Sequence, residues 1–576
     1  MKTYKFLIAI ILSALVTSCA DDLLDRFPED TLSPETYFKQ SSELELWLNR
    51  CYSMFDDLTD VAATNADDDI DNTPGDLIMG QRLPSTESGW NWQMLRHINF
   101  YLQNSGNCED ASAKKQYDGV ARFFRAYFYF VKVRRYGDVP WYNQVLNSED
   151  DELLYKARDD RGLVMDSVMA DLDKAIELLP TKKDQLHVTK WTALAFKSRA
   201  ALYEGTFRKY HGLGNSEKYL QQSADAAYNF IKNGGYKLYT KGTTPYRDMF
   251  NSDDAVSEEV ILTRIYSAAA KVFNSAQFNI SNDKLGFTRR FMNHYLMNDG
   301  TRFIDQEGWE TMQFVEETKN RDPRMAQTVL TPGYIQVGSS SSTVNTLTSL
   351  TGYQPIKYVA SSAYGGSNKG VCDYPLFRAA EVMLNYAEAK AELGTLTQND
   401  LDISINVIRS RAGMPNLSLS DANANPDALL LTYYPNVTKG SNTGVILEIR
   451  RERTVEMPME GLRHWDILRW KEGKQFTNKF YGCYFPGEGE YDMDGDGTAD
   501  VKLYSTSKGS FSGSSYKIGT DIVLSEGTKG YVVALPKISL SWDETRDYLW
   551  PIPASERVLT GGILSQNPGW DDGLSF

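Results

Sequence analysis

Four aspartates near the end of the chain have the spacing of ligands for a hard cation. They stand at positions 1, 3, 5 and 9 of one stretch that has Gly497 at position 6: Asp492, Asp494, Asp496 and Asp500. Calcium prefers clustered carboxylate oxygens around such a turn. Position 12 is Leu503 and not the glutamate that would bind the ion through both oxygens. The stretch therefore fits either a structural calcium site or an Asp-Gly turn without metal, and the sequence requires no other cofactor.

One cysteine near the N-terminus is placed to carry a lipid. Lys2 and Lys5 precede an apolar run over residues 6–16, and Thr17 and Ser18 lead from that run to Cys19. A short run after basic residues is typical of a secretory signal rather than a membrane-spanning helix. Because the run ends on cysteine, we expect a lipoprotein signal peptide over 1–18 and an acyl lipid such as palmitate on Cys19. An ordinary signal peptide whose cysteine has no role is the alternative.

Aromatic side chains in loops are the candidates for ligand binding. Sugar recognition needs exposed aromatic faces for the rings and planar polar groups for the hydroxyls. The chain has 34 tyrosines, 25 phenylalanines and 11 tryptophans. With one arginine from a polar loop, the candidates are Arg82, Trp90, Trp92, Trp309, Tyr353, Tyr358 and Tyr364. For each of them, core packing or loop anchoring is the alternative.

The chain carries none of the short catalytic motifs that we sought. Its five histidines are dispersed without metal-ligand spacing, and it has no G-x-S-x-G, phosphate-loop or dinucleotide motif. A glycosidase pair of carboxylates stays open, because its two members usually lie far apart in sequence. We therefore expect no enzymatic activity and keep a glycosidase as an alternative.

Charge and cysteine content exclude some further functions. The net charge of −15 becomes −17 once the two signal lysines leave, which disfavours nucleic acid as a partner. It also argues weakly against a polyanionic glycan, although a local basic patch could survive the average. Four cysteines follow Cys19 without a C-x-x-C pair: Cys51, Cys108, Cys372 and Cys483. Buried free thiols are favoured over one or two disulfides.

Helical periodicity dominates the first half of the chain. Helices are expected over 117–136, 160–179 and 216–231, with another that Thr189 caps. The offsets Val168-x3-Leu172-x2-Ala175-x4-Pro180 and Ala226-x3-Phe230 are similar to the second helix of a tetratricopeptide repeat. A plain helical bundle would show similar alternation of small and large residues.

The rest of the chain alternates irregular and helical stretches. Residues 56–90 read as a long polar loop, and the helix signal fades between 236 and 370. Helices return at 375–393, 401–412 and 445–470, before loops and strands over 473–550. We divide the chain into the signal peptide 1–18, an N-terminal helical region 19–235 and a C-terminal region 236–576 with the insertions and the last helix pair.

Several runs in order resemble the SusD/RagB family of surface nutrient-binding lipoproteins over nearly the whole chain. Early runs are Leu23-Leu24-Asp25 and Pro28-Glu29-Asp30, and the middle gives Lys319-Asn320-Arg321-Asp322-Pro323-Arg324-Met325. The strongest later runs are 377–389, 408–413, 450–457 and 460–470, followed by Pro551-Ile552-Pro553 and 566–570.

The resemblance implies a mostly α-helical fold with about four tetratricopeptide-like helix pairs and irregular insertions. It implies a lipid anchor on the extracellular side of the outer membrane and partnership with a SusC-like TonB-dependent transporter. The implied function is oligosaccharide capture for uptake, with peptide or protein binding as the alternative. The Asp492–Asp500 stretch is also similar to a loop of many family members.

The charged residues in the strongest runs are predicted to stabilise the fold and not to bind ligand. They have mixed charges near i, i+3 and i+4 spacing: Arg451, Glu452, Arg453, Glu456, Arg463 and Asp466. We expect an ion-pair network within the last helix pair, and no catalytic role.

Overall fold

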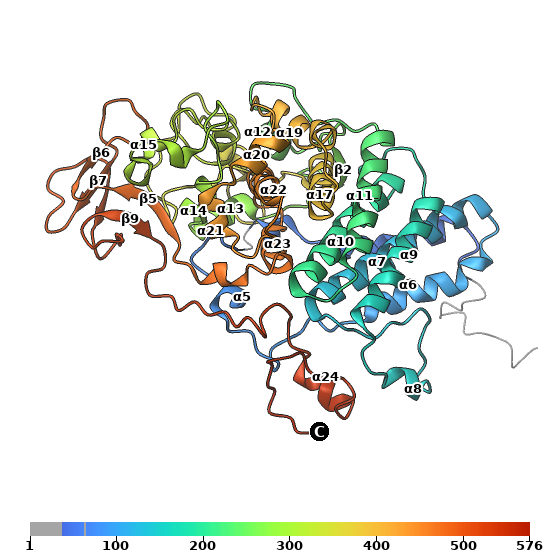
Figure 1. Ribbon diagram of the computed structural model, residues 1–576. Coiled ribbons are helices and arrows are strands. Elements are labelled where there is room, and N and C mark those ends of the chain that lie inside the picture. The colour runs from blue at the N-terminus through green and yellow to red at the C-terminus, as the bar shows by residue number, and fades with distance from the viewer. Residues whose placement is uncertain (1–36, 63–64) are drawn as a thin grey trace, which may run out of the picture.

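The computed structural model describes residues 37–62 and 65–576. Cys19 and the expected signal peptide lie outside the described residues. Helices gather on one side of the molecule, on the right in Figure 1, and a loop-rich part with small sheets forms the other side. No helix in the described part of the chain is long and apolar enough to cross a membrane.

The helical side is a row of packed helices. Each of five helices packs on the next along the chain: α6 (Gln93–Asn104), α7 (Ala111–Tyr136), α9 (Arg161–Leu178), α10 (Lys190–His211) and α11 (Ser216–Asn233). Small residues let them approach closely, since a Cβ atom at Gly205 of α10 would lie 2.8 Å from Cγ of Leu220 on α11. Thr189 caps α10 as expected, because its Oγ1 accepts from the amide of Thr192.

The row continues with helices from the far end of the chain. α17 (Ala379–Glu392) packs on α11, α22 (Thr443–Glu456) packs on α17, and α23 (Arg463–Arg469) packs on α10. The expected mostly α fold with tetratricopeptide-like pairs is therefore confirmed, and the long middle segment is an insertion in the repeat.

Three expected helices are shorter than the sequence suggests. Residues 374–378 form the strand β4, and α17 starts only at Ala379. The expected helix 445–470 is two helices, because Pro458 cannot continue α22 and Gly461 takes a positive φ of 71°. The expected helix 401–412 is likewise divided into α18 (Gln398–Asp402) and α19 (Ile405–Arg411).

Within the described residues, the strands form four small sheets. β1 (Asp69–Ile70) pairs with β3 (Gly286–Phe287), β2 (Val260–Arg264) with β4, and β5 (Tyr481–Phe485) with β9 (Gly530–Val533), all antiparallel. β7 (Val501–Tyr504) pairs antiparallel with β6 (Gly489–Tyr491) and parallel with β8 (Ser514–Lys517). The expected loops and strands over 473–550 are thus confirmed.

Short helices fill the remaining segments. The α-helices among them are α3 (Ser41–Asn49), α4 (Leu58–Val61), α5 (Asp76–Met79), α8 (Asp151–Leu154), α12 (Pro245–Phe250), α13 (Ala276–Asn282), α14 (Arg289–Met292), α15 (Phe314–Glu317), α16 (Met325–Thr328), α20 (Leu419–Ala424), α21 (Ala428–Tyr433) and α24 (Ala554–Leu559). The 3-10 turns are η1 (Arg50–Met54), η2 (Ser105–Asn107), η3 (Phe303–Asp305), η4 (Trp309–Thr311), η5 (Ser362–Tyr364) and η6 (Gly473–Thr477).

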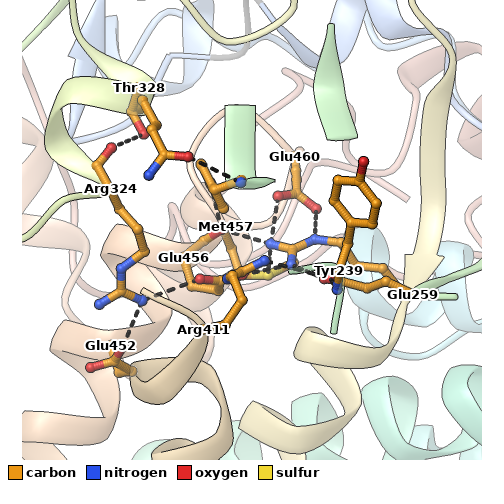
Figure 2. A network of polar contacts seen from close by, with 12 residues as sticks. Tyr239, Glu259, Arg324, Thr328, Arg411, Glu452, Glu456, Met457 and Glu460 are labelled. Carbon is orange, nitrogen blue, oxygen red and sulfur yellow. Dashed lines mark hydrogen bonds and ion pairs between the residues drawn. The ribbon is translucent and has the colours of Figure 1, made fainter. Parts of the chain in front are cut away.

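A buried ion-pair network joins the insertion to the helical row. Glu456 of α22 lies between Arg324 and Arg411, and it also pairs with Arg378 of β4 (Figure 2). Burial alone would raise the pKa of Glu456, but these guanidinium groups outweigh it and hold the pKa below its ordinary value. The expected ion-pair network is present. It links residues within the last helix pair, such as Arg453 and Asp466, and it also includes partners from distant parts of the chain, such as Arg324 and Arg378.

The cysteines behave as the sequence suggests. Cys51, Cys108, Cys372 and Cys483 are buried free thiols in the described part of the chain. Burial raises the pKa of the Cys51 thiol to about 12, so this group stays protonated and inert.

Candidate functional site

The candidate site is a pocket of about 720 Å³ with a mixed polar and aromatic lining, on the loop-rich side of the molecule. Four half-buried aromatic side chains line it: Trp309, Tyr433, Tyr481 and Tyr531. They come from η4, from the end of α21 and from the paired strands β5 and β9. The pocket therefore combines segments that are more than two hundred residues apart in sequence.

Pairing of the short strands β1 and β3 builds one wall of the pocket. The amide of Thr288, directly after β3, donates to the carbonyl oxygen of Asp68 at 2.8 Å. Oγ1 of Thr288 donates to the carbonyl oxygen of Asp67 (3.0 Å) and accepts from the amide of Phe291, which caps α14. Two arginines on α14 are thereby placed at the pocket, and Arg290 lies beside Asp67.

Arg290 connects a buried carboxylate to an aromatic ring. Its Nε lies 2.7 Å from Oδ2 of Asp67, and its guanidinium carbon lies 4.0 Å from the ring centroid of Tyr433. Nη1 donates to Oε1 of Gln475 (2.7 Å) and Nη2 donates to the carbonyl oxygen of Tyr433 (2.8 Å). These contacts fix the position of the Tyr433 ring at the pocket wall.

Arg289 supports two further rings in a similar way. Its guanidinium carbon lies 4.5 Å from the ring centroid of Tyr531 and 5.8 Å from that of Trp309. Nη2 donates to the carbonyl oxygen of Trp309 at 2.8 Å, and Nη1 pairs with Glu317 at 3.2 Å. Glu317 is itself buried behind the pocket.

Amide and hydroxyl groups complete the lining. Asn293 and Gln475 are buried, whereas Thr432, Thr477 and Asn478 are exposed at the rim. Oδ1 of Asn293 has no hydrogen-bond partner among the described residues. Aromatic faces next to amides and hydroxyls can hold a ring that has an apolar face and several hydroxyl groups.

The aspartates of residues 67–71 are buried, although they belong to the stretch that the sequence predicts as a long polar loop. Arg463 and Arg290 both pair with Asp67, and they hold its pKa below the ordinary value although burial alone would raise it. For Asp68, burial raises the pKa to about 7. Oδ1 of Asp68 has no hydrogen-bond partner among the described residues.

Of the residues expected from the sequence, Trp309 lies in this pocket. Trp90 and Trp92 line a second, more apolar cavity of about 390 Å³ between α6, α8 and α24. Trp90 is 8% exposed, and Trp92 packs edge-on against Trp90 and Tyr142. No residue is shared between the linings of the two cavities. The tryptophans predicted from the sequence therefore lie in two separate cavities, Trp309 in one and Trp90 with Trp92 in the other.

Three of the expected ligand residues belong to the scaffold instead. Arg82 is buried against Asp547, 3.0 Å away, and its guanidinium group lies over the Trp550 ring. Tyr353 and Tyr358 are 0% and 1% exposed, so no face of either ring is open to a ligand. Tyr364, in η5, is half-buried and lines neither of the two cavities.

The aspartate-rich stretch forms the exposed turn between β6 and β7. One carboxylate oxygen from each of Asp492, Asp494 and Asp500 lies within 4.8 Å of the others. Asp496 is outside this group, and its Oδ1 accepts from the amide of Thr498 at 2.7 Å. Three converging carboxylates are suitable donors for calcium, and Leu503 at position 12 is buried in β7.

Sequence reasoning missed most of the pocket. The unforeseen members are Asp67, Arg289, Arg290, Tyr433, Tyr481 and Tyr531. With 34 tyrosines in the chain, a tyrosine in a loop carries little information on its own. The one signal in the sequence that could have indicated this pocket is the pair of adjacent arginines, Arg289 and Arg290, shortly after Gly286–Phe287.

Comparison with known families gives two matches. The model described as "SusD family" matches residues 210–570, and the model described as "Starch-binding associating with outer membrane" matches residues 86–202. A curated relative, SusD-like protein P2 of Formosa agariphila, is 23% identical over 609 residues, which cover 99% of this chain and all of the relative.

Solved structures show the same fold. A SusD-like protein of Bacteroides fragilis has a TM-score of 0.68 at 22% identity and covers 95% of this chain and all of its own. A SusD-like carbohydrate-binding protein of the same species has a TM-score of 0.67 at 20% identity, with 91% of this chain and 99% of its own covered. The fold is thereby established.

Proposed function

The chain belongs to the SusD family, and we propose that it is a surface lipoprotein that captures oligosaccharides and passes them to a TonB-dependent outer-membrane transporter. The observation that carries the proposal is the pocket of Trp309, where four half-buried aromatic rings stand next to amide and hydroxyl groups. Stacking on the rings and hydrogen bonds to the hydroxyls would give reversible binding. Modest affinity suits release to a transporter.

Binding without turnover is part of the proposal. Among the described residues that line the pocket, Asp67 is the one carboxylate, and two arginines pair with it. A glycosidase needs two carboxylates on either side of the scissile bond, one of them protonated as the acid. The arrangement therefore favours a binding protein over the glycosidase alternative.

Anchoring and location belong to the same proposal. We place the lipid on Cys19 and the folded part on the extracellular side of the outer membrane. Support comes from the lipoprotein signal pattern and from the family model that describes association with the outer membrane. The divisions of the chain near residues 18 and 235 stay predictions.

Calcium at the turn between β6 and β7 is also proposed. Asp492, Asp494 and Asp500 would hold the ion, which would stiffen an exposed hairpin far from any chemistry.

A glycan screen tests the proposed function. The mature lipoprotein in detergent is titrated against a broad panel of neutral and acidic glycans, and each mixture is analysed for cleavage products. We expect binding without cleavage, weakened at least about tenfold by Trp309→Ala, which equals about 1.4 kcal/mol of binding free energy. Tyr364→Ala, another half-buried aromatic outside the pocket, is the matched control and should bind as the native protein does.

Other results would redirect the proposal. Cleavage products would favour the glycosidase. Failure of the whole panel, together with binding of a peptide library, would favour the peptide-binding alternative.

A further inference from the structure

The pocket of Trp309 carries three basic side chains, Arg289, Arg290 and Lys479, and at first sight resembles a site for acidic sugars. An arginine recognises a carboxylate or sulfate through a free fork of N–H donors. Whether these arginines have such a fork free decides which class of glycan the pocket can take.

Arg290 is buried among groups of the protein. Its Nε lies in an ion pair with Asp67 without forming a hydrogen bond, and Nη1 and Nη2 donate to Gln475 and to the carbonyl oxygen of Tyr433. One face of the guanidinium group lies on the Tyr433 ring, and the side chain is only 11% exposed. A two-point contact with a ligand carboxylate would require this side chain to move off the Tyr433 ring and away from Asp67, which would weaken a buried ion pair.

Arg289 is engaged to the same degree. Its terminal nitrogens contact Glu317, the hydroxyl of Tyr353 and the carbonyl oxygens of Trp309 and Glu310. The side chain is 6% exposed, and the Tyr531 ring covers it. Arg289 therefore supports an aromatic wall and is closed to an anion in the pocket.

The remaining charges do not favour an anion. Glu317 behind the lining pairs with Arg289, and Asp67 in the lining pairs with both Arg290 and Arg463, so these guanidinium groups already face carboxylates of the protein. Lys479 at the exposed rim is the one cation of the described lining without an ion pair. The whole chain carries a net charge of −15. A carboxylate or sulfate that entered the pocket would lose water without gaining a buried cation.

The polar groups that remain are suited to hydroxyls. Thr432, Thr477 and Asn478 present hydroxyl and amide groups at the exposed rim, and each of these groups can accept a hydrogen bond. A sugar hydroxyl can donate, whereas an ionised carboxylate or sulfate can only accept. The half-buried rings of Trp309, Tyr433 and Tyr531 add apolar faces without charge.

We propose that the pocket of Trp309 selects uncharged stretches of glycan and excludes chains with a carboxylate or sulfate on the bound sugar units. Arg289 and Arg290 hold the aromatic side chains of the pocket wall in place and do not contact the ligand. The inference rests on the proposed function, since it names the substrate class of the same site.

The test uses the glycan from the panel that the mature lipoprotein binds most tightly. If that glycan is neutral, its primary hydroxyls are oxidised to carboxylates, and the carboxylates of a second portion are then converted to neutral amides. We expect oxidation to weaken binding at least about tenfold and the amide form to recover most of the loss. The recovery separates an effect of charge from one of shape.

Two results overturn the inference while the proposed function stands. One is an acidic glycan as the tightest ligand of the panel, with binding that weakens in high salt. The other is an oxidised product that binds as well as its neutral parent. Failure of every glycan, neutral ones included, would instead contradict the proposed function itself.

Lys479→Gln provides a second readout at the rim. If the pocket selects neutral glycans, this variant keeps the preference for the neutral form over its oxidised product. A variant that keeps its affinity for the neutral form but loses at least about tenfold of its affinity for the oxidised product would show that the Lys479 ammonium recognises carboxylates in the pocket, which contradicts the account.

Discussion

At the scale of single residues, burial decides what the charged and aromatic side chains can do. Arg289 and Arg290 lie in the pocket wall, yet each is engaged by a carboxylate and covered by an aromatic ring. Tyr353 has the same chemical character as Tyr433, but it is 0% exposed and its hydroxyl donates to Glu317 at 2.7 Å. Residues of the same type therefore differ in role because the surrounding side chains bury one and leave the other partly exposed.

The sequence could not distinguish these roles. Trp309 was predicted as a candidate, and it lies in the pocket. Tyr358 and Arg82 were predicted as candidates in the same way, yet both are buried. Which loop residue is covered depends on tertiary packing, and the alternation of residue types along a loop does not encode it.

Asp68 gives a prediction for pH dependence. Its pKa is about 7 in the folded protein, above the ordinary value of 3.8, so the folded state holds the proton more tightly than the unfolded state. The free energy of unfolding should therefore fall as pH rises from about 4 through 7. Asp68→Asn removes the buried charge, and we expect it to raise the free energy of unfolding at pH 8 by at least about 1 kcal/mol.

Denaturant unfolding at pH 5 and pH 8 measures this effect. The gain from Asp68→Asn should be larger at pH 8, where the native carboxyl group is ionised. Asp76→Asn, at an exposed position in the same region, serves as the control. An equal effect of Asp68→Asn at the two pH values would show that the Asp68 carboxyl group does not titrate in this range.

At the scale of secondary-structure elements, periodicity located the long helices well. α7, α9, α10 and α11 were all predicted, since their apolar positions repeat at helical spacing and caps such as Thr189 mark their starts. Prediction failed where a local break was required, as at Met459 and Gly461 between α22 and α23, both with positive φ. Pairing of β4 with β2 is a long-range contact that no local pattern reveals.

The ion-pair network around Glu456 predicts a large effect of one substitution. Glu456→Gln leaves Arg324, Arg378 and Arg411 without their common carboxylate in a buried place. We expect the free energy of unfolding to fall by about 3–5 kcal/mol, as is typical when one partner of a buried ion pair is removed. Thermal and denaturant unfolding of the purified variant measure it.

Glu177→Gln is the matched control for this substitution. Glu177 pairs with Lys174 on the exposed surface of α9, and removal of an exposed pair changes stability little. The account of the network would be contradicted if Glu456→Gln unfolded at the same temperature as the native protein.

The turn between β6 and β7 predicts a specific response to calcium. Calcium at saturating concentration should raise the melting temperature by about 1–3 °C relative to a chelator. Asp494→Asn should abolish the rise, because Asp494 is one of the three converging carboxylates. Asp496→Asn should keep it, because Asp496 is outside that group. A rise that survives Asp494→Asn would place the calcium elsewhere.

At the scale of the whole molecule, the chain forms a helical row and a loop-rich side, and the candidate site lies on the loop-rich side. The helical row lies on one side of the molecule (Figure 1). The pocket of Trp309 is lined by segments of the loop-rich side. The buried network around Glu456 (Figure 2) connects the loop-rich side to the helical row. In it, Arg378 of β4 forms an ion pair with Glu456 of α22. The overall architecture could be predicted, since the repeat is local in sequence, whereas the pocket is assembled from five or more distant segments.

The proposed anchor gives a prediction for the whole molecule in the cell. Cys19→Ala removes the thiol that would carry the lipid, so the protein should leave the membrane fraction. Fractionation of cells that lack the partner transporter measures this directly. Retention of Cys19→Ala in membranes of such cells would contradict lipid anchoring at this cysteine.

The most direct test of the central claim is a crystal structure of the protein with the oligosaccharide that it binds best. The account predicts sugar units against Trp309, Tyr433 and Tyr531, with the pairs Arg290–Asp67 and Arg289–Glu317 unbroken. Sugar bound only in the cavity of Trp92, or on the helical row, would contradict it.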